Sequence, residues 1–557
     1  MRSLGGVPIP VDRRKLNLLF WLLAGSLVFY LVFFNDAPVP ISRLGMSLAL
    51  VGAILLPSWL WVSNRSQGLP MFPIYGLFFF PTYAVPLCRG DTRFAQYTEP
   101  EIANGVLTVV GYLLLATLVW WQCTNRNLAP SARVRALDPA KSTNLMLLLL
   151  VGGILFELLG GLAGERVGGA YQALRGYAQN GSRLAIFVLF YQMGRGQLGK
   201  GVAVLTLLMA GGLVVRQAAG IVLASTFPVL GLALAGFFLG SGKIPWKSVG
   251  AVTGLIVLLH SGKAEMRSIY YKEGVSVGLL DYPAFFLEWM AKGAVGLTKG
   301  TSTEGVEIQS AKERSALLPL FLQIQRMTPA QVPYLEGASY RYLPSMLIPR
   351  IITKDKAVSH ISNMIMAVHY GILTVENVWF TSIAFDLPME AYANYGLVGV
   401  VGLAVVMGLF LGLTTLMTTG VPLFSFRFLM AILILSAVIS SNNTMGVFVT
   451  TTWQGFLALF TLSLVIMKTI PNPLYAKPGA LRKMGDGRSE MGRNEAGREV
   501  EDRRWEIGGR ETEDRGLRTE GGGLASSIPQ TPSAAQPEAG QERHERPRRF
   551  IYGEKKK

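Results

Sequence analysis

Residues 394–417 read NYGLVGVVGLAVVMGLFLGLTTLM, and this stretch decides the class of fold. It contains no charged residue, and about 20 consecutive apolar residues are enough for an α-helix to cross a bilayer. Half of the 557-residue chain is hydrophobic and only 16% is charged, which is low for a soluble protein. The sequence therefore predicts an all-α, polytopic membrane protein.

Further apolar segments bring the predicted number of transmembrane helices to about 12, the sixth and seventh being short. The predicted segments are 16–34, 44–62, 71–87, 102–121, 144–163, 184–194, 202–215, 221–240, 249–262, 394–417, 423–440 and 446–467. The first is too long for the apolar part of a cleaved signal peptide, so it is predicted to be a retained helix.

Lysine and arginine residues gather in alternate connections between these segments, and cytoplasmic loops are the ones that keep positive charge. The residues concerned are Arg13, Arg14, Lys15, Arg126, Arg133, Arg135, Lys141, Arg195, Lys200, Lys243 and Lys247. Both termini are therefore predicted to be cytoplasmic. The polar insertion 263–393 is predicted to lie outside, and Cys88 and Cys123 fall on opposite sides, which argues against a disulfide.

This orientation divides the chain into four predicted parts. They are about nine transmembrane helices (1–262), a large external loop containing short helices (263–393), about three further helices (394–467) and a cytoplasmic tail (468–557). The tail is rich in Gly, Arg, Glu, Ser and Pro and is predicted to be disordered. Its charges alternate in sign, which argues against nucleic acid as a partner, because phosphate binding requires a basic surplus.

Two kinds of cofactor chemistry find no support in the sequence. The four histidines and two cysteines have no metal-ligand spacing, and no Gly-rich motif for cradling the phosphates of ATP is present. No metal and no other cofactor is therefore predicted.

Three basic groups near the predicted outer membrane face are candidates for binding an anion. Arg216 ends a small apolar segment, where it either reaches the lipid headgroups or binds a phosphate through its planar guanidinium. Lys263 and Arg267 are four residues apart and share one face of a helix. They either bind a phosphate or anchor the end of that helix at the membrane surface.

The third and strongest group lies in the stretch 334–356, YLEGASYRYLPSMLIPRIITKDK. Pro349 favours a helix start, so Arg350 and Lys354 are predicted to share a face near a helix N-terminus, where main-chain N–H groups also attract anions. The alternative is a basic segment lying on anionic lipid. Arg341 and Lys356 flank the pair.

Carboxylates near these cations are candidates for the base that activates an acceptor hydroxyl. They are Glu336 in the same stretch, Asp386 and Glu390 before the tenth helix, and Glu157 within the fifth helix. Glu157 is predicted to be costly unless it pairs, for example with Arg216. Tyrosines, Tyr340 among them, either stack on sugars or belong to an interfacial aromatic belt.

The order of these parts resembles the Wzy-type polysaccharide polymerases, which are relatives of the O-antigen ligases. The likeness rests on "YLEGASYRYLPSMLIPR" and "MEAYANYGLVGVVGLAVVMGLFLG" and covers roughly residues 200–420. The chain departs from that family at Val214 to Gln217, where Gly-Ser-Arg-Gly is usual, and at 351–356, where Trp-Pro and Lys-Pro are usual. Arg350 is therefore the residue that the resemblance assigns best.

The resemblance implies a GT-C-like glycosyltransferase of the bacterial inner membrane that joins polyprenyl-pyrophosphate-linked oligosaccharide repeat units without a metal. It implies that Arg216, Arg267 and Arg350 hold pyrophosphate and that Glu336 or Glu390 is the base. Lys263, Tyr340, Arg341, Lys354 and Lys356 would contribute to substrate binding. Flippase and chain-length regulator proteins are candidate partners.

Two alternatives stay open at this point. An O-antigen ligase would share nearly all of these features and differ only in its acceptor. A transporter or flippase for lipid-linked sugars would not be an enzyme, and it is expected to have broken helices with ionisable residues near the bilayer midplane.

Overall fold

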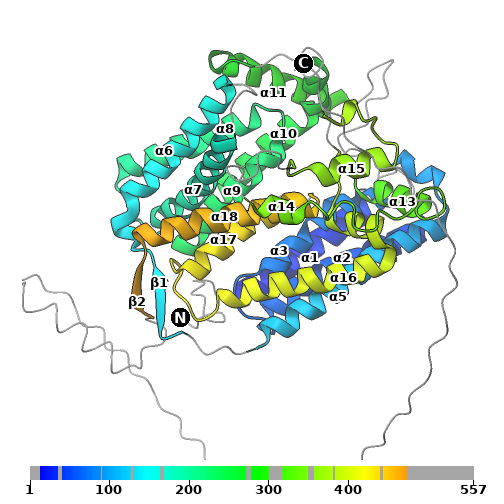
Figure 1. The fold of residues 1–557 in the computed structure, drawn as a ribbon, viewed down its shortest axis with the longest axis horizontal. Coiled ribbons are helices and arrows are strands. Elements are labelled where there is room, and N and C mark those ends of the chain that lie inside the picture. The colour runs from blue at the N-terminus through cyan, green and yellow to red at the C-terminus, as the bar shows by residue number, and fades with distance from the viewer. Residues whose placement is uncertain are drawn as a thin grey trace, which may run out of the picture. The chain divides into compact units, whose positions relative to one another are not determined.

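Apolar sequence and helical structure coincide along the chain in this computed structural model, which describes residues 13–34, 40–88, 91–126, 131–163, 169–270, 277–299, 316–348, 357–379, 383–439 and 443–472. The α-helices (Figure 1) are α1 (Arg13–Phe33), α2 (Ile41–Val62), α3 (Met71–Leu77), α4 (Val85–Cys88), α5 (Glu99–Thr124), α6 (Pro139–Ala163), α7 (Gly169–Gly194), α8 (Lys200–Ala218), α9 (Phe227–Ser241), α10 (Trp246–Tyr270), α11 (Tyr282–Lys299), α13 (Leu318–Met327), α14 (Leu343–Leu347), α15 (Ile361–His369), α16 (Leu387–Met417), α17 (Phe426–Val438) and α18 (Met445–Ile466).

Nine helical segments within the described residues are long and apolar enough to cross a membrane, as expected for a polytopic membrane protein. Each predicted apolar segment overlaps a helix, but the count of 12 spans goes beyond these nine. α17 is apolar but shorter, while α7 and α10 are long but more polar. α7 begins at Gly169, well before the predicted start at Leu184, and α10 continues past the predicted end at Gly262.

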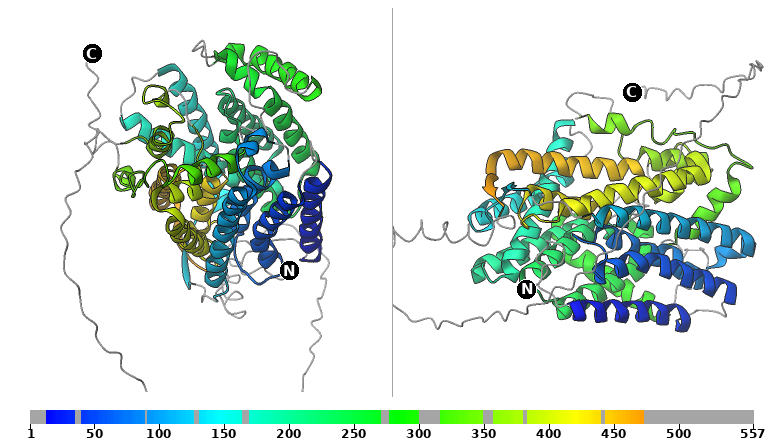
Figure 2. Two further views of the ribbon diagram at one scale, coloured as in Figure 1. Left: turned by 90° about the vertical axis from the view of Figure 1, so that its right-hand side faces the viewer. Right: turned by 90° about the horizontal axis from the view of Figure 1, so that it is seen from below.

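The long helices run beside one another around a common hydrophobic core (Figure 2). Gly408 of α16 lies on the main chain of Ala116 in α5, and Gly236 of α9 lies on the main-chain oxygen of Phe187 in α7. Small residues at helix crossings let two backbones approach, and dispersion contacts then stabilise the pair inside a membrane.

Contacts between the helix connections join those that the predicted alternation places on the same side. At one end of α16, the main-chain N–H of Leu69 donates to the hydroxyl of Thr418 at 2.9 Å. At its other end, the main-chain N–H of Met445 donates to the carboxylate of Glu390 at 2.6 Å. Which end faces the cytoplasm rests on the lysine and arginine distribution and stays a prediction.

A small sheet at the predicted cytoplasmic end departs from the all-α prediction. β1 (Arg133–Ala136) and β2 (Lys468–Pro471) pair antiparallel. Directly after β2, the Asn472 side chain donates to the main-chain oxygens of Ser131 at 2.9 Å and Gly420 at 2.8 Å. Strands of four residues contain too few positions for an alternating pattern, so this sheet could not be predicted from the sequence.

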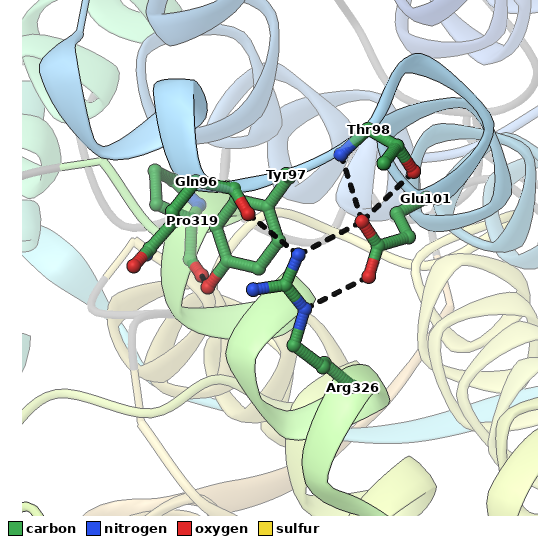
Figure 3. Close-up of polar contacts among 6 residues, drawn as sticks. All are labelled: Gln96, Tyr97, Thr98, Glu101, Pro319 and Arg326. Atoms are coloured by element: carbon green, nitrogen blue, oxygen red, sulfur yellow. Dashed lines mark hydrogen bonds and ion pairs between the residues drawn. The ribbon is translucent and has the colours of Figure 1, made fainter.

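The predicted external loop is firmly docked where α13 meets the start of α5 (Figure 3). The Arg326 guanidinium donates to both carboxylate oxygens of Glu101, at 2.8 and 2.9 Å, and to the main-chain oxygen of Gln96 at 2.6 Å. It also lies 4.4 Å from the ring centroid of Tyr97. Glu101 accepts from the main chain and hydroxyl of Thr98, so one carboxylate both caps α5 and holds α13.

α16 consists of two helical parts with a break at Tyr395 and Gly396. Gly396 has φ 59° and ψ −144°, a conformation that only glycine adopts readily. The first part begins at Asp386, whose carboxylate accepts from the main-chain N–H of Met389 and from the hydroxyl of Tyr83, which lies in a π-helical turn between α3 and α4. Burial raises the pKa of Asp386 to about 6, although both hydrogen bonds oppose that shift. The break lies within two residues of the predicted start of the tenth helix.

Candidate functional site

The tyrosine-rich stretch 334–342 of the predicted external loop folds over the break in α16. The main-chain N–H of Leu335 donates to the oxygen of Ala393 at 2.9 Å, and that of Glu336 donates to the oxygen of Asn394 at 3.2 Å. Because the helix is interrupted at this point, these oxygens have no helical N–H partner four residues later. The break in α16 is thus the feature that receives the loop.

Two glycines and two tyrosines interlock where the loop meets the break. Gly337 has φ +84°, and the hydroxyl of Tyr395 occupies the space that a Cβ at Gly337 would fill. A Cβ at Gly396 would lie 2.8 Å from the hydroxyl of Tyr334. Each glycine therefore makes room for a tyrosine of the other segment, which fixes the position of the loop.

Glu390 lies beneath this loop and is fully buried. One carboxylate oxygen accepts from the hydroxyl of Ser339 at 2.8 Å, and the other accepts from the main-chain N–H of Met445 at 2.6 Å. The amide of Asn394 donates to the same serine hydroxyl at 2.8 Å. Since both oxygens are used and shielded, the geometry favours a positioning role for Glu390, joining the loop, α16 and α18, over the predicted contact with a substrate.

Glu336 and Arg341 are the exposed charged groups of the same stretch. Glu336 has φ +46°, an uncommon conformation for a residue with a side chain, of the kind found at functional sites. Arg341 donates to the hydroxyl of Tyr342 at 2.6 Å and lies 4.7 Å from its ring centroid. Tyr340 is partly buried, its ring lies 6.5 Å from that of Tyr395, and burial raises its pKa well above the usual range. An exposed carboxylate and an exposed guanidinium thus sit beside aromatic rings.

A second polar group, here called the arginine cluster, comprises Arg175, Arg183 and Arg216 around Glu157 on α6, α7 and α8. Arg175 pairs with the Glu157 carboxylate at 3.3 Å, and Gln179 donates to its other oxygen. Arg183 interacts electrostatically with the same carboxylate. Arg216 donates to the main-chain oxygen of Glu157 at 3.2 Å. Three guanidinium groups therefore interact with Glu157, and Arg175 is the one shown to pair with its carboxylate.

The predicted pairing of Glu157 with Arg216 is wrong in its chemistry. The two residues are in contact, but through a main-chain oxygen, and Arg175 takes the carboxylate. Arg175 and Arg183 were not predicted as site residues, because the sixth predicted segment begins at Leu184, after both of them. The signal was present, since Arg175, Gln179 and Arg183 repeat every four residues and so share one face of a helix.

Arg267 lies beside the turn that follows α8. Its guanidinium donates to the main-chain oxygen of Ile221 at 3.0 Å, and Ile221 comes shortly after Arg216 in the chain. Lys263 lies one turn earlier on α10 and is partly buried. Glu265, between them, pairs with Lys292 of α11 at 2.6 Å. Arg267 of α10 thus binds the turn that follows Arg216 of α8, and a small hydrophobic cluster joins that turn to α10 and α11.

Three predicted binding residues lie outside the described residues: Arg350, Lys354 and Lys356. The chain shortly before them is anchored, because the main-chain oxygen of Leu347 accepts from the indole N–H of Trp453 on α18 at 2.8 Å. The next residue of α18, Gln454, lies against Gly176 of α7. Gly176 adjoins Arg175. The described end of α14 therefore contacts α18, and α18 lies against α7 next to the arginine cluster.

The candidate site residues therefore form two described neighbourhoods, the loop on α16 and the cations near the ends of α6, α7, α8 and α10. Within the described part of the chain, no group of three or more His, Cys, Asp or Glu side chains is placed to hold a metal ion. No protein-family model, no curated protein and no solved structure matches this chain.

Proposed function

We propose that the protein is a membrane glycosyltransferase that joins polyprenyl-pyrophosphate-linked oligosaccharide repeat units on the outer face of the bacterial inner membrane. The observation that carries this proposal is the arginine cluster. Arg175 pairs with the Glu157 carboxylate, Arg183 interacts with it electrostatically and Arg216 binds its main-chain oxygen, so three positive charges share one carboxylate among the cluster's members. Excess positive charge among membrane helices is costly, and an anionic ligand such as pyrophosphate would offset that cost.

The proposed chemistry follows from how charge moves in glycosyl transfer. Negative charge builds on the departing lipid pyrophosphate as the bond to the sugar breaks, and fixed guanidinium groups stabilise that charge. Arg175, Arg183 and Arg216 supply these groups, together with Arg267 and Arg350 as predicted from the sequence. Bonds to Glu157 already hold Arg175 and Arg216 before substrate arrives, which lowers the reorganisation cost of the step.

The acceptor side of the reaction is assigned to the stretch 334–342. Glu336 is the exposed carboxylate there and would take the proton from the acceptor hydroxyl. Tyr340 and Arg341 offer an aromatic face and hydrogen-bond donors to a sugar. Glu390 holds this stretch on α16 through Ser339. The resemblance of residues 200–420 to Wzy-type polymerases supports the same assignment.

The rival function as a transporter receives support from one observation, since both α16 and the α3–α4 segment are broken. Both breaks lie near the end of the bundle that carries the predicted external loop, as the bonds from Tyr83 to Asp386 and from Leu335 to Ala393 show. A transport site is expected near the bilayer midplane. The breaks lie toward one end of the bundle, so their position fits a site that opens to one side better than it fits a transport site.

The test is to incubate purified protein in liposomes with a polyprenyl-pyrophosphate-linked repeat unit and to separate the glycans by size. A ladder of products formed without a further acceptor is the expected result. Product that forms only when lipid A core is added would identify a ligase. Movement of the lipid-linked sugar across the vesicle without any new bond would identify a transporter.

Variants of the arginine cluster link that activity to the site. Arg175→Lys and Arg216→Lys keep the charge but lose the planar fork, and each should slow ladder formation about 100-fold. Arg350→Ala should abolish long polymer and leave single repeats. Arg93→Lys is the matched control, because Arg93 pairs with Asp91 in the connection before α5. Normal polymer from all three site variants would remove the arginine cluster and Arg350 from the mechanism.

A further inference from the structure

α11 belongs to the predicted external loop, yet it packs along α10 in the direction of the membrane. Gly293 of α11 lies on the main-chain oxygen of Leu258, and a Cβ at Gly262 would lie 2.7 Å from the nitrogen of Gly293. The hydroxyl of Ser261 donates to the main-chain oxygen of Gly293 at 2.7 Å. Leu258, Ser261 and Gly262 belong to the apolar segment 249–262, so the second half of α11 is level with residues predicted to be inside the membrane. Both helices appear in green, side by side, in the left view of Figure 2.

The charged residues in the middle of α11 turn toward α10. Lys292 pairs with Glu265 of α10 at 2.6 Å. Glu288 accepts from the hydroxyl of Tyr270 at 2.9 Å. These groups are neutralised or bonded within the helix pair, so they place no charge on the opposite face of α11.

That opposite face is apolar and exposed. Leu287 is 64% exposed, Leu297 is 55% exposed, and Ala291 between them is exposed as well. By contrast, Phe285 and Trp289 on the α10 side are buried. Large apolar side chains gain free energy on leaving water, so a whole helix face of this kind requires an apolar environment.

α10, on which α11 packs, also exposes apolar side chains in its predicted transmembrane part. Leu255 and Val257 of α10 are 46% and 50% exposed, and both lie within the segment 249–262. Leu280, just before α11, is 96% exposed. Both helices of the pair therefore present apolar side chains, and lipid is the environment predicted for this segment of α10.

We propose that α11 is immersed in the outer side of the membrane, with the face formed by Leu287, Ala291 and Leu297 against the acyl chains of lipids. Residues 282–299 are then a membrane-embedded helix packed along α10 and no part of a water-exposed loop. α10 and α11 together present lipid with a helical hairpin at the same end of the fold as Arg267. The proposal does not depend on which reaction the protein performs.

The test uses single cysteines in full-length protein from which Cys88 and Cys123 have been removed. Leu287→Cys and Leu297→Cys are labelled with bimane in liposomes, and quenching by nitroxide-labelled phospholipid is compared with quenching by aqueous iodide. Leu208→Cys is the lipid-facing control, because Leu208 is 68% exposed within the candidate span Lys200–Ala218. Glu376→Cys, at an exposed polar position of the predicted external loop, is the water-facing control.

Quenching of both α11 labels by the phospholipid, at the level found for Leu208→Cys, is the expected result. Quenching by iodide at the level of Glu376→Cys would overturn the proposal, because α11 would then face water. Weak quenching by both agents would also overturn it, because a second copy of the chain or another protein would then cover this face. The two labelled positions are independent, so failure of one variant to fold leaves the other as the test.

Discussion

Substitution of Glu390 gives the sharpest test of how the loop is held on α16. In Glu390→Ala, the buried hydroxyl of Ser339 and the partly buried main-chain N–H of Met445 lose their acceptors. A buried donor without a partner costs about 1–3 kcal/mol and a partly buried one costs less, so the free energy of unfolding should fall by about 2–4 kcal/mol. Glu390→Gln keeps one acceptor oxygen, so its loss should be about half of that.

Ser339→Ala probes the same network from the loop side. It removes the donor to Glu390 and the acceptor of the Asn394 amide, which also has the main-chain oxygen of Glu390 as a partner. We expect a loss of about 1–3 kcal/mol, similar to that of Glu390→Gln. Because both variants loosen one loop, both should lower polymer formation to a similar degree.

The assay combines thermal unfolding of the purified variants with the glycan ladder in liposomes. Parallel losses of unfolding temperature and polymer in Glu390→Gln and Ser339→Ala are expected. The reasoning fails if Glu390→Gln unfolds like the wild type and makes no polymer while Ser339→Ala makes it normally. That pattern would mean that Glu390 transfers a proton in the reaction, as the sequence predicted.

Three further predictions concern stability, measured as thermal unfolding of purified protein. Gly396→Ala should lower the free energy of unfolding by about 1–3 kcal/mol, because φ 59° with ψ −144° disfavours any Cβ and a tyrosine hydroxyl occupies the place of that Cβ. Gly402 has open space around it, so Gly402→Ala is the control and should be neutral. Equal effects of the two substitutions would contradict this account. Arg326→Lys should lower the unfolding temperature slightly at low salt and have no effect at high salt, because a bidentate pair becomes a single, partly exposed contact. An unchanged unfolding temperature at low salt would count against this account. The folded-state pKa of Asp386 is raised to about 6, so its ionised form destabilises the fold. Lowering the pH from 7 to 5 protonates this carboxyl and should therefore stabilise the wild type relative to Asp386→Asn. A stability difference that stays constant with pH would contradict the shift.

Hydrophobic length is a local property, and it predicted where the apolar helices lie, although 12 spans were predicted and nine described helical segments are long and apolar enough to cross a membrane. Each predicted apolar segment overlaps a helix, and the boundary drawn before residue 394 lies within two residues of the break at Gly396. A run of apolar residues needs no knowledge of its neighbours to be recognised as a helix that avoids water.

Features that depend on contacts between residues far apart in the chain could not be predicted from the sequence. The polar first half of α7, with Arg175 and Arg183, becomes a helix because Glu157 and its neighbours on α6 receive it. The charged side chains of α11 could not be predicted to face α10, because Lys292 and Glu288 are bound by Glu265 and Tyr270, which precede α11 in the chain. The candidate site was therefore only partly foreseen: its cations on α8 and α10 were identified, and those on α7 were not.

The pairing of β1 with β2 also sets an order on biosynthesis. Asn472 binds Ser131, which is 341 residues earlier in the chain, so β1 leaves the ribosome long before its partner exists. β2 can pair with it only if the helices between the two strands cross the bilayer an even number of times, because both strands have to lie on the same side. Skipping or reversing a single crossing is therefore expected to prevent this sheet from closing.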